Sequence, residues 1–344
     1  MLVGLVGCGR IGQVHAATLA THPLVTGIEI VDPRGLPPAM AAGPGRLVGA
    51  VDAAASRWAA AVVATPTADH DAVVRTLLGR GIPTFCEKPI TLDPTTTSEL
   101  GRMAGDAGVP LRSGLQRRFD PAIRTVRSVL ESGEIGDLLW LALSTRDPAP
   151  PPRDYLTRSG GVFLDMHIHD IDVLVWLLGT VDLGITALGG GQDQPELAGL
   201  NDYGTTCLAL RSRTGTLATI TGSRWSPTGY AVELTALGRL GELRLRSDGT
   251  VTVHMGDTIT TVHAGSGTVA SSFVDRFADA YQAAISDFIG EVDGATGSGA
   301  GWRDDLVAVG IGQVAHIAAA RPTWFLDRPY GAQSPRRSAA RASA

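Results

Sequence analysis

The chain has 344 residues, long enough for two domains of ordinary size. It carries 29 Lys and Arg residues against 34 Asp and Glu residues, a formal net charge of −5, which gives no electrostatic reason to expect nucleic acid or an anionic membrane as a partner. Its three cysteines lie far apart, which is typical of a reduced, intracellular protein. The apolar start LVGLVG is too short for a signal peptide, and no apolar run approaches the roughly 20 residues that span a bilayer. We therefore expect a soluble cytoplasmic enzyme or sensor.

The first third of the chain alternates short apolar strands with helices. Strands are expected at 2–6, 27–31, 59–64 and 82–86. Helices are expected at 11–20, at 69–79 and from 94 to about 107, where Asp93 would cap a helix that begins with proline. This order predicts an α/β Rossmann domain, a doubly wound parallel sheet, over residues 1–118.

The pattern changes after about residue 118. A helix at 121–131 and a strand at 137–144 precede a proline-rich loop and an apolar helix that contains GGVFLDMHIHDID. Period-two alternation with glycine-centred turns then runs from 181 to 263, and helical spacing returns from 273 to 289 and from 302 to 320. We expect an α+β domain over residues 119–327 with a large, open, mainly antiparallel sheet, followed by a disordered tail at 328–344.

The first strand is followed by a GxGxxG motif that opens the first helix: Gly7-Cys8-Gly9-Arg10-Ile11-Gly12. In a dinucleotide site, Gly7 allows the tight turn, Gly9 lets the backbone approach the pyrophosphate, and Gly12 lets the helix pack on the strand. Backbone N–H groups at the start of the helix would hold the phosphates. Asp32, at the end of the second strand, would bind the adenosine ribose and favour NAD, while Arg34 leaves NADP open.

Polar residues also follow the third and fourth strands, at the edge where ligands bind in open α/β sheets. We assign these residues to the cofactor site: Thr65, Pro66, Thr67, His70, Glu87 and Lys88. Thr67 would also cap the following helix. Lys88 is expected to reach toward the nicotinamide ribose and a substrate hydroxyl, and a cis Lys88–Pro89 bond would suit a tight turn. The alternative for Lys88 is a solvated side chain in a turn.

The apolar helix at 160–179 carries ionisable groups that are costly to bury without a partner. Successive helical residues turn by about 100°, so Asp165, His169 and Asp172 would share one face. A carboxylate one turn before a histidine can orient the imidazole as a general base that takes a proton from an alcohol. The alternative is a structural Asp–His bond in the core. HIHD offers too few ligands for a metal, and we expect none.

Six segments in this order resemble the Gfo/Idh/MocA oxidoreductases, and among them the myo-inositol 2-dehydrogenase branch: GCGRIGQVHA, ATPTADH, EKP, QRRFDPA, TRDPAPPP and SGGVFLDMHIHDID. The resemblance extends to about residue 327. It implies homodimers or homotetramers that assemble through the second sheet. It also implies catalytic roles for Lys88, Asp165 and His169, and substrate contacts from Arg118, Asp147, Asp165, His169 and Tyr230. The chain departs from the family pattern at 32–45, where the usual second helix is truncated, and at 225–227.

These features predict NAD-dependent oxidation of a secondary alcohol on a cyclitol or pyranose. His169 would take the hydroxyl proton while the carbinol C–H delivers hydride to nicotinamide C4. Asp165 would orient His169, and Lys88 would polarise the substrate oxygen. Three alternatives stay open: an NADPH-dependent ketosugar or ketocyclitol reductase of secondary metabolism, a non-catalytic dinucleotide-sensing regulator, and a lyase that retains NAD for transient oxidation.

Overall fold

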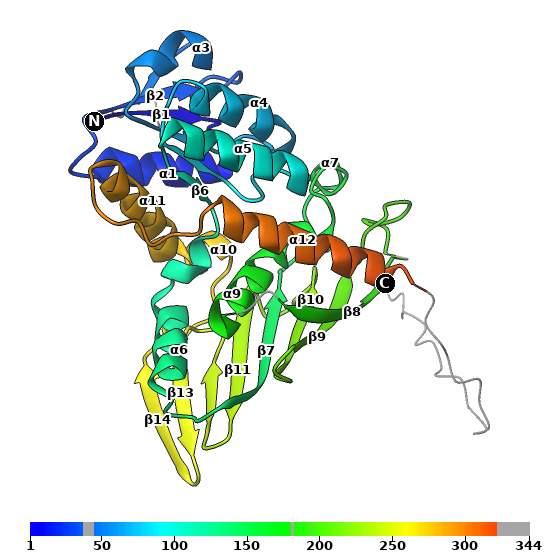
Figure 1. Ribbon diagram of the computed structural model, residues 1–344. Coiled ribbons are helices and arrows are strands. Elements are labelled where there is room, and N and C mark those ends of the chain that lie inside the picture. The colour runs from blue at the N-terminus through cyan, green and yellow to red at the C-terminus, as the bar shows by residue number, and fades with distance from the viewer. Residues whose placement is uncertain (37–44, 180–181, 193, 322–344) are drawn as a thin grey trace, which may run out of the picture.

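The computed structural model describes residues 1–36, 45–179, 182–192 and 194–321, and its strands form two sheets (Figure 1). The first sheet has six parallel strands in the order β3-β2-β1-β4-β5-β6. The strands are β1 (Leu2–Val6), β2 (Gly27–Val31), β3 (Gly45–Leu47), β4 (Ala60–Val63), β5 (Thr84–Cys86) and β6 (Leu111–Ser113). The helices between them are α1 (Arg10–Thr21), α3 (Val51–Ala54), α4 (Thr67–Leu78) and α5 (Pro94–Ala107). This confirms the doubly wound sheet and adds the short strands β3 and β6.

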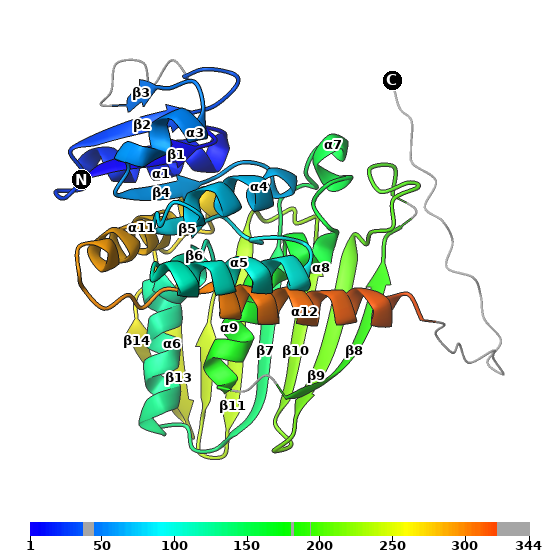
Figure 2. The same cartoon turned by 45° about the horizontal axis from the view of Figure 1, so that its top comes forward.

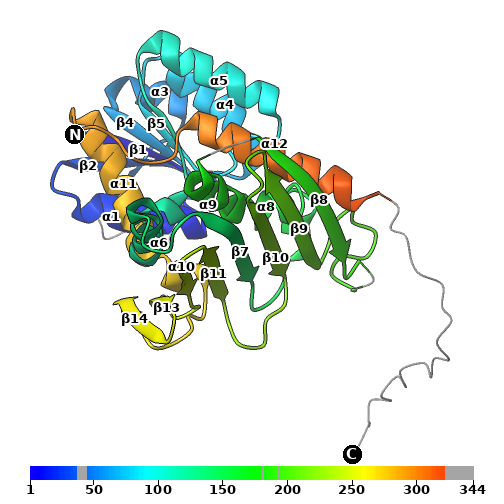
Figure 3. The same cartoon turned by 60° about the horizontal axis from the view of Figure 1, so that its bottom comes forward.

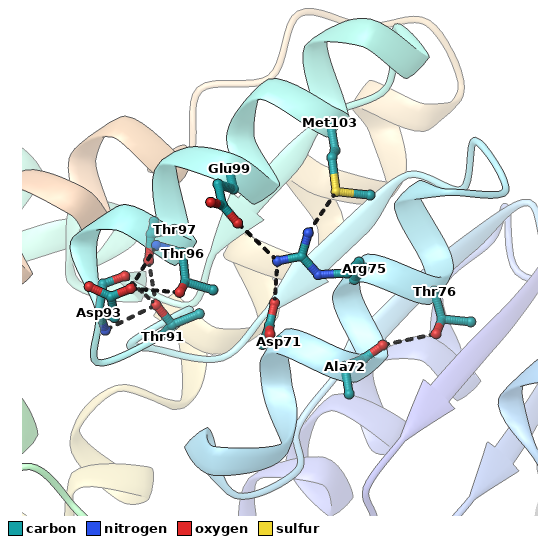
Figure 4. Close-up of polar contacts among 10 residues, drawn as sticks. All are labelled: Asp71, Ala72, Arg75, Thr76, Thr91, Asp93, Thr96, Thr97, Glu99 and Met103. Carbon is teal, nitrogen blue, oxygen red and sulfur yellow. Dashed lines mark hydrogen bonds and ion pairs between the residues drawn. The ribbon is translucent and has the colours of Figure 1, made fainter.

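Three contacts fix the chain between β5 and α5. Asp93 caps α5 as the sequence predicts, because its carboxylate accepts the backbone N–H of Thr96 at 3.0 Å. The Thr91 hydroxyl donates to the carbonyl of Asp93 at 2.7 Å, and Arg75 on α4 pairs with Glu99 on α5 at 3.3 Å (Figure 4). These bonds hold the turn between β5 and α5, which contains the EKP segment.

The second sheet has eight strands in the order β14-β13-β12-β11-β7-β10-β9-β8. Its pairs are antiparallel except for β7 and β10, which run parallel, so the prediction of a mainly antiparallel sheet is confirmed. The strands are β7 (Leu138–Arg146), β8 (Leu183–Gly190), β9 (Thr205–Ser212), β10 (Leu217–Ser223), β11 (Ala231–Gly238), β12 (Glu242–Leu245), β13 (Val251–Met255) and β14 (Thr258–His263).

Helices cover the face of the second sheet that is turned toward the first (Figures 2 and 3). They are α6 (Pro121–Ser132), α9 (Ile168–Leu178) and α12 (Trp302–Ala319). Alternate residues of β9 are buried on this face and exposed on the other, which is the pattern of a sheet with one face on the core. Leu188, Leu217 and Leu237 are exposed. Within the described ranges, no helix is both long enough and apolar enough to cross a membrane.

The end of the chain joins the two sheets. Helix α12 contacts α5 and β6 on one side and α9 and β8 on the other, and α11 (Ala278–Val292) packs beside α1 (Figure 2). Asp305 of α12 is fully buried, and its carboxylate accepts the backbone N–H of Ile90 at 3.1 Å and the hydroxyl of Ser113 at 2.7 Å. Burial raises the pKa of Asp305 to about 7.

The helix predicted over 160–179 is interrupted. It forms α8 (Val162–Asp165) and α9, with Gly179 as the left-handed C-cap that the sequence predicts. Between the two, the N–H of His167 bonds to the carbonyl of Val162, five residues back, at 3.0 Å. Such a wide turn shifts the residues that follow around the helix axis. The expectation that Asp165 and His169 share one helical face is therefore wrong.

The remaining predictions on chain segments fall partly outside the described residues. The connection between β2 and β4 contains β3 and the one-turn helix α3 in its described part, while residues 37–44 lie outside it. The tail predicted at 328–344 also lies outside the described residues. The proline-rich loop before α8 contains one further short helix, α7 (Arg153–Leu156), which the sequence did not indicate.

Candidate active site

The turn between β1 and α1 has no room for side chains at two of its glycines. Gly7 has a φ of +91°, and a Cβ there would lie 2.6 Å from the carbonyl oxygen of Ala64. A Cβ on Gly12 would lie 2.2 Å from the carbonyl oxygen of Gly7. At Gly9 the nearest atom to such a Cβ is the exposed guanidinium of Arg34, at 3.6 Å. The turn thus leaves the backbone at the start of α1 open to an anion and fits a pyrophosphate.

Asp32 is positioned and ionised by its neighbours. Its carboxylate accepts the backbone N–H groups of Cys8 at 2.7 Å and Arg34 at 2.8 Å. The Arg34 side chain adds two hydrogen bonds at 3.2 Å, and these lower the pKa of Asp32 to about 2. Asp32 is therefore an acceptor for ribose hydroxyls, and it engages Arg34, an arginine that could otherwise bind a 2′-phosphate. This arrangement fits NAD.

Replacing Asp32 with serine is expected to weaken the use of NAD and improve the use of NADP. A hydrogen bond to a charged group contributes about 1.5–3 kcal/mol, so kcat/KM for NAD should fall by roughly 10–100-fold. The freed Arg34 would then bind a 2′-phosphate. Steady-state kinetics with both cofactors measures this, with Asp69→Ser at the exposed start of α4 as the control. An unchanged NAD-to-NADP ratio in Asp32→Ser would contradict the prediction.

The other residues predicted for the cofactor site connect loops of the first sheet. His70 is buried, with Nδ1 3.0 Å from the carbonyl of Pro89 and Nε2 2.9 Å from the carbonyl of Thr65. Burial lowers its pKa. Glu87 bonds to Nε2 of His15 at 2.7 Å. Thr67 is the first residue of α4 and Pro66 is its N-cap, with no side-chain bond, so the expected capping role of Thr67 is wrong.

The start of α1 also meets the second part of the chain. The guanidinium of Arg10 lies 4.6 Å from the ring centre of Phe273, which begins α10 (Phe273–Arg276), and Ile11 packs against the main core. The turn between β1 and α1 is therefore next to α10, which follows the last strand of the larger sheet.

Lys88 extends from the end of β5 to the end of α8, which brings the two parts of the site together. Its Nζ donates to the carbonyl oxygen of Asp165 at 2.6 Å and lies 3.7 Å from Oδ1 of the same residue. The same carboxylate accepts the hydroxyl of Tyr155 at 2.6 Å and Nη1 of Arg224 at 3.2 Å. Lys88 is the only lysine in the chain. The sequence placed Lys88 and Asp165 together, but it did not indicate Tyr155 or Arg224.

Arg224 is fully buried between two carboxylates. Besides Asp165 it contacts Asp202, with Nη2 3.0 Å from Oδ2. The other oxygen of Asp202 accepts the N–H of Val162 at 2.7 Å, so it satisfies the start of α8. Arg224 therefore binds Asp165 through Nη1. Through Nη2 it binds Asp202, which in turn holds the start of α8. Because Arg224 lies 59 residues from Asp165 in the chain, no local pattern could reveal the pair.

Replacing Arg224 with methionine is expected to lower the free energy of unfolding by about 3–5 kcal/mol, because two partly or fully buried carboxylates lose their cation. Chemical denaturation measures the loss. Arg239→Met is the matched control, since Arg239 forms an exposed pair with Asp137 at 3.6 Å and should cost less than about 1 kcal/mol. Equal losses of unfolding free energy in the two variants would contradict a larger contribution from the buried ion pairs of Arg224 than from the exposed pair of Arg239.

His169 is buried and has no hydrogen-bond partner among the residues that the structure describes; its Nδ1 is fully enclosed. Burial, with the nearby positive charges of Lys88 and Arg117, holds the pKa of His169 well below its usual value of 6.5. The imidazole is thus neutral at physiological pH. Asp165 does not orient it, contrary to expectation, because the Asp165 carboxylate is engaged by Tyr155, Arg224 and Lys88.

The two arginines of the RRFD segment point to different partners. Both lie in a short 3-10 helix (Gln116–Phe119). Arg118 is paired with Asp172 at 3.0 Å and Asp304 at 2.8 Å, so it belongs to an ion-pair network with α9 and α12. Arg117 is the arginine beside the site: it contacts Asp170 at 2.6 Å and the Tyr230 hydroxyl at 3.1 Å. The sequence indicated Arg118 for this position and did not single out Arg117.

Asp147 follows the end of β7, and Tyr230 precedes the start of the antiparallel neighbour β11, so both lie at the same edge of the sheet. Asp147 follows β7, and its N–H donates to the carbonyl of Ser223 at 2.9 Å. Burial and the negative charge of Asp165 together raise the pKa of Asp147 to about 6. Tyr230 is buried with its hydroxyl against Arg117. Among the described residues, no group of three or more His, Cys, Asp or Glu side chains is arranged to hold a metal ion.

Comparisons with known proteins agree with this architecture. Residues 1–115 match the model of the oxidoreductase family with an NAD-binding Rossmann fold, and residues 123–244 match the GFO/IDH/MocA C-terminal domain. A myo-inositol dehydrogenase of Streptomyces leeuwenhoekii is 34% identical over 313 residues, which cover 88% of this chain and 93% of that protein. An inositol 2-dehydrogenase of Rhizobium meliloti is 31% identical, with 91% and 94% covered.

Solved structures show the same similarity. The myo-inositol dehydrogenase of Corynebacterium glutamicum superposes with a TM-score of 0.81 at 32% identity, covering 93% of this chain and 96% of that one. The scyllo-inositol dehydrogenase of Lactobacillus casei, with NAD(H) and scyllo-inositol bound, gives a TM-score of 0.78 at 25% identity over 92% and 96%. With both halves matched and the phosphate cradle intact, the chain belongs to the Gfo/Idh/MocA family of NAD-binding oxidoreductases.

Proposed function

We propose that this oxidoreductase removes hydrogen from a secondary alcohol on a cyclitol ring, with a pyranose sugar as the second substrate class. The main support is the position of Lys88. From the edge of the nucleotide-binding sheet it contacts Asp165 and acts electrostatically on the buried, neutral His169. The relatives named as inositol dehydrogenases support the substrate class. Asp32, which engages Arg34, favours NAD over NADP.

Each residue has a role that follows from its surroundings. NAD, when bound, accepts the hydride of the carbinol carbon. His169 takes the hydroxyl proton, since an imidazole kept neutral by burial is ready to accept one. Lys88 donates a hydrogen bond to the substrate oxygen and stabilises negative charge on it. Asp165 keeps the Lys88 ammonium in place through its carbonyl and carboxylate oxygens.

A substrate panel tests the proposal. Formation of NADH is measured with inositol isomers, amino-inositols and hexoses, each with NAD and NADP. We expect turnover with at least one cyclitol and a preference for NAD. No turnover with any cyclitol, or turnover only as reduction of a keto compound with NADPH, would reject the proposal in favour of the reductase alternative.

Two broader expectations accompany it. We propose the division into a nucleotide-binding domain at 1–118 and a substrate domain at 119–327.

We also propose a homodimer or homotetramer that forms through the uncovered face of the second sheet. Leu217 and Leu237 support this, because they flank Trp140 in one row of that face and are 51% and 37% exposed. Sedimentation velocity would give the subunit number, and a monomer would contradict the assembly.

A further inference from the structure

The positively charged groups of the site already have negatively charged partners. Lys88 is paired with Asp165, Arg224 with Asp165 and Asp202, and Arg117 with Asp170: their closest N–O distances are 3.7, 3.2, 3.0 and 2.6 Å. Asp147 differs from these carboxylates. Its side chain forms no hydrogen bond and no ion pair with any residue that the structure describes; only its backbone N–H is engaged.

The strand register places Asp147 inside the same cluster. Arg146, the last residue of β7, pairs with Ser223 on β10 and with Ala231 on β11. Asp147 is one residue further along, beside Arg224 and Tyr230, which follow and precede those two partners. Its carboxylate interacts electrostatically with Asp165, Arg224, Arg117, Lys88 and Tyr230. Asp147 therefore faces the groups assigned to the reaction.

His169 provides a second, independent sign that a ligand is missing from this cluster. Its side chain is more than nine-tenths buried, and its imidazole has no partner within the described part of the chain. Lys88 and Arg117 act on His169 and on Asp147 alike. An unpartnered base and an unpartnered anion in one partly buried cluster are each costly unless a bound molecule satisfies them.

We propose that Asp147 binds a positively charged amino group of the substrate, so that the preferred substrates are amino-substituted cyclitols. This inference rests on the proposed function. An ammonium group donates three hydrogen bonds and can form the direct ion pair that Asp147 lacks with the described residues, whereas a hydroxyl supplies hydrogen bonds only. The reacting carbon is a different ring carbon: it loses its hydride to NAD and its hydroxyl proton to His169, and the C–N bond stays intact.

The test compares an amino-deoxy-inositol with the inositol of the same configuration, at pH 7 with NAD. We expect the amine to have a kcat/KM at least about tenfold higher, the effect of one charge-assisted hydrogen bond. N-acetylation of the amine removes its charge and should abolish the preference. As the pH falls below about 6, Asp147 takes up a proton and the preference should decline.

The variant Asp147→Asn should bring the amine-to-inositol ratio close to one. The ratio is the readout, because any loss of activity common to both substrates cancels in it. Asp137→Asn is the matched control: Asp137 precedes the other end of β7, its side chain is 89% exposed, and the ratio should keep its wild-type value. Equal kcat/KM for the two substrates in the wild type, or a preference that survives Asp147→Asn, would overturn the inference.

The same comparison distinguishes this inference from the proposed function. Turnover of inositol without any preference for the amine would leave the proposed function standing and reject the role of Asp147. If neither compound is oxidised, the proposed function fails. Calorimetric binding of both compounds to the NAD-loaded protein then decides whether Asp147 recognises the amine, since binding requires no turnover. Equal affinities would reject that recognition.

Discussion

Replacing Lys88 with methionine is expected to lower kcat/KM for the alcohol by about 10²–10⁴-fold, the usual contribution of a positioned acid–base group. Methionine keeps much of the length and apolar character of the side chain but removes the ammonium that contacts both the carbonyl and the carboxylate of Asp165. The loss should fall mainly on kcat, because the phosphate cradle and Asp32 remain intact and NAD affinity should change little.

Because Lys88 is the only lysine of the chain, chemical modification can repeat this experiment on the natural protein. Reductive methylation keeps the positive charge and removes N–H donors. We expect it to inactivate the enzyme in the absence of ligands and to be slowed by NAD together with substrate. Lys88→Met protein treated in the same way controls for the terminal amine. Near-wild-type turnover after replacement or complete methylation would exclude Lys88 from the chemistry.

Replacing His169 with asparagine is expected to lower kcat by a similar factor, about 10²–10⁴-fold, and to change the pH profile. In the wild type, kcat/KM should fall at acid pH as His169 becomes protonated, with an apparent pKa below 6.5, because burial and the charges of Lys88 and Arg117 disfavour the imidazolium. His169→Asn should lose that acid limb. His263, which ends β14, provides a control histidine in His263→Asn.

The same low pKa affects stability in a direction that is fixed by proton linkage. Below about pH 6.5 the unfolded chain takes up a proton at residue 169, whereas the folded chain takes it up only at a lower pH. The folded protein therefore loses stability as the pH falls through this window, and His169→Asn should reduce that loss. An acid limb and a pH-dependence of stability that are both unchanged in His169→Asn would contradict the assignment.

The first sheet and its cofactor turn could be predicted because their signals are local. A glycine that must adopt positive φ, a proline that follows a capping aspartate, and short apolar strands each act within a few residues, and Gly7, Asp93 and β2 appear where the sequence places them. The position of Lys88 at the end of β5 could be predicted for a related reason, because the carboxyl ends of parallel strands converge at one edge of the sheet.

The failures have one physical origin, which is that side chains distant in sequence decide the outcome. The predicted face with Asp165 and His169 assumed a regular helix, but Asp202 holds the start of α8, and the carbonyl of Asp165 accepts the Lys88 ammonium. Arg117 and Arg118 are adjacent residues of the same type, so the local sequence does not distinguish them. Their different positions depend on Asp170 and Asp172, which are more than 50 residues further along the chain.

The contact between Asp305 and Ile90 ties the segment after Lys88 to the end of the described chain. Ile90 lies two residues after Lys88, and the carboxylate that holds its N–H is 215 residues away, in the last helix that the structure describes. A nascent chain will have completed its nucleotide-binding strands long before the ribosome makes α12. Until that helix emerges and docks, the segment after Lys88 lacks this contact, so we expect partly synthesised chains to bind the dinucleotide without turning over any alcohol.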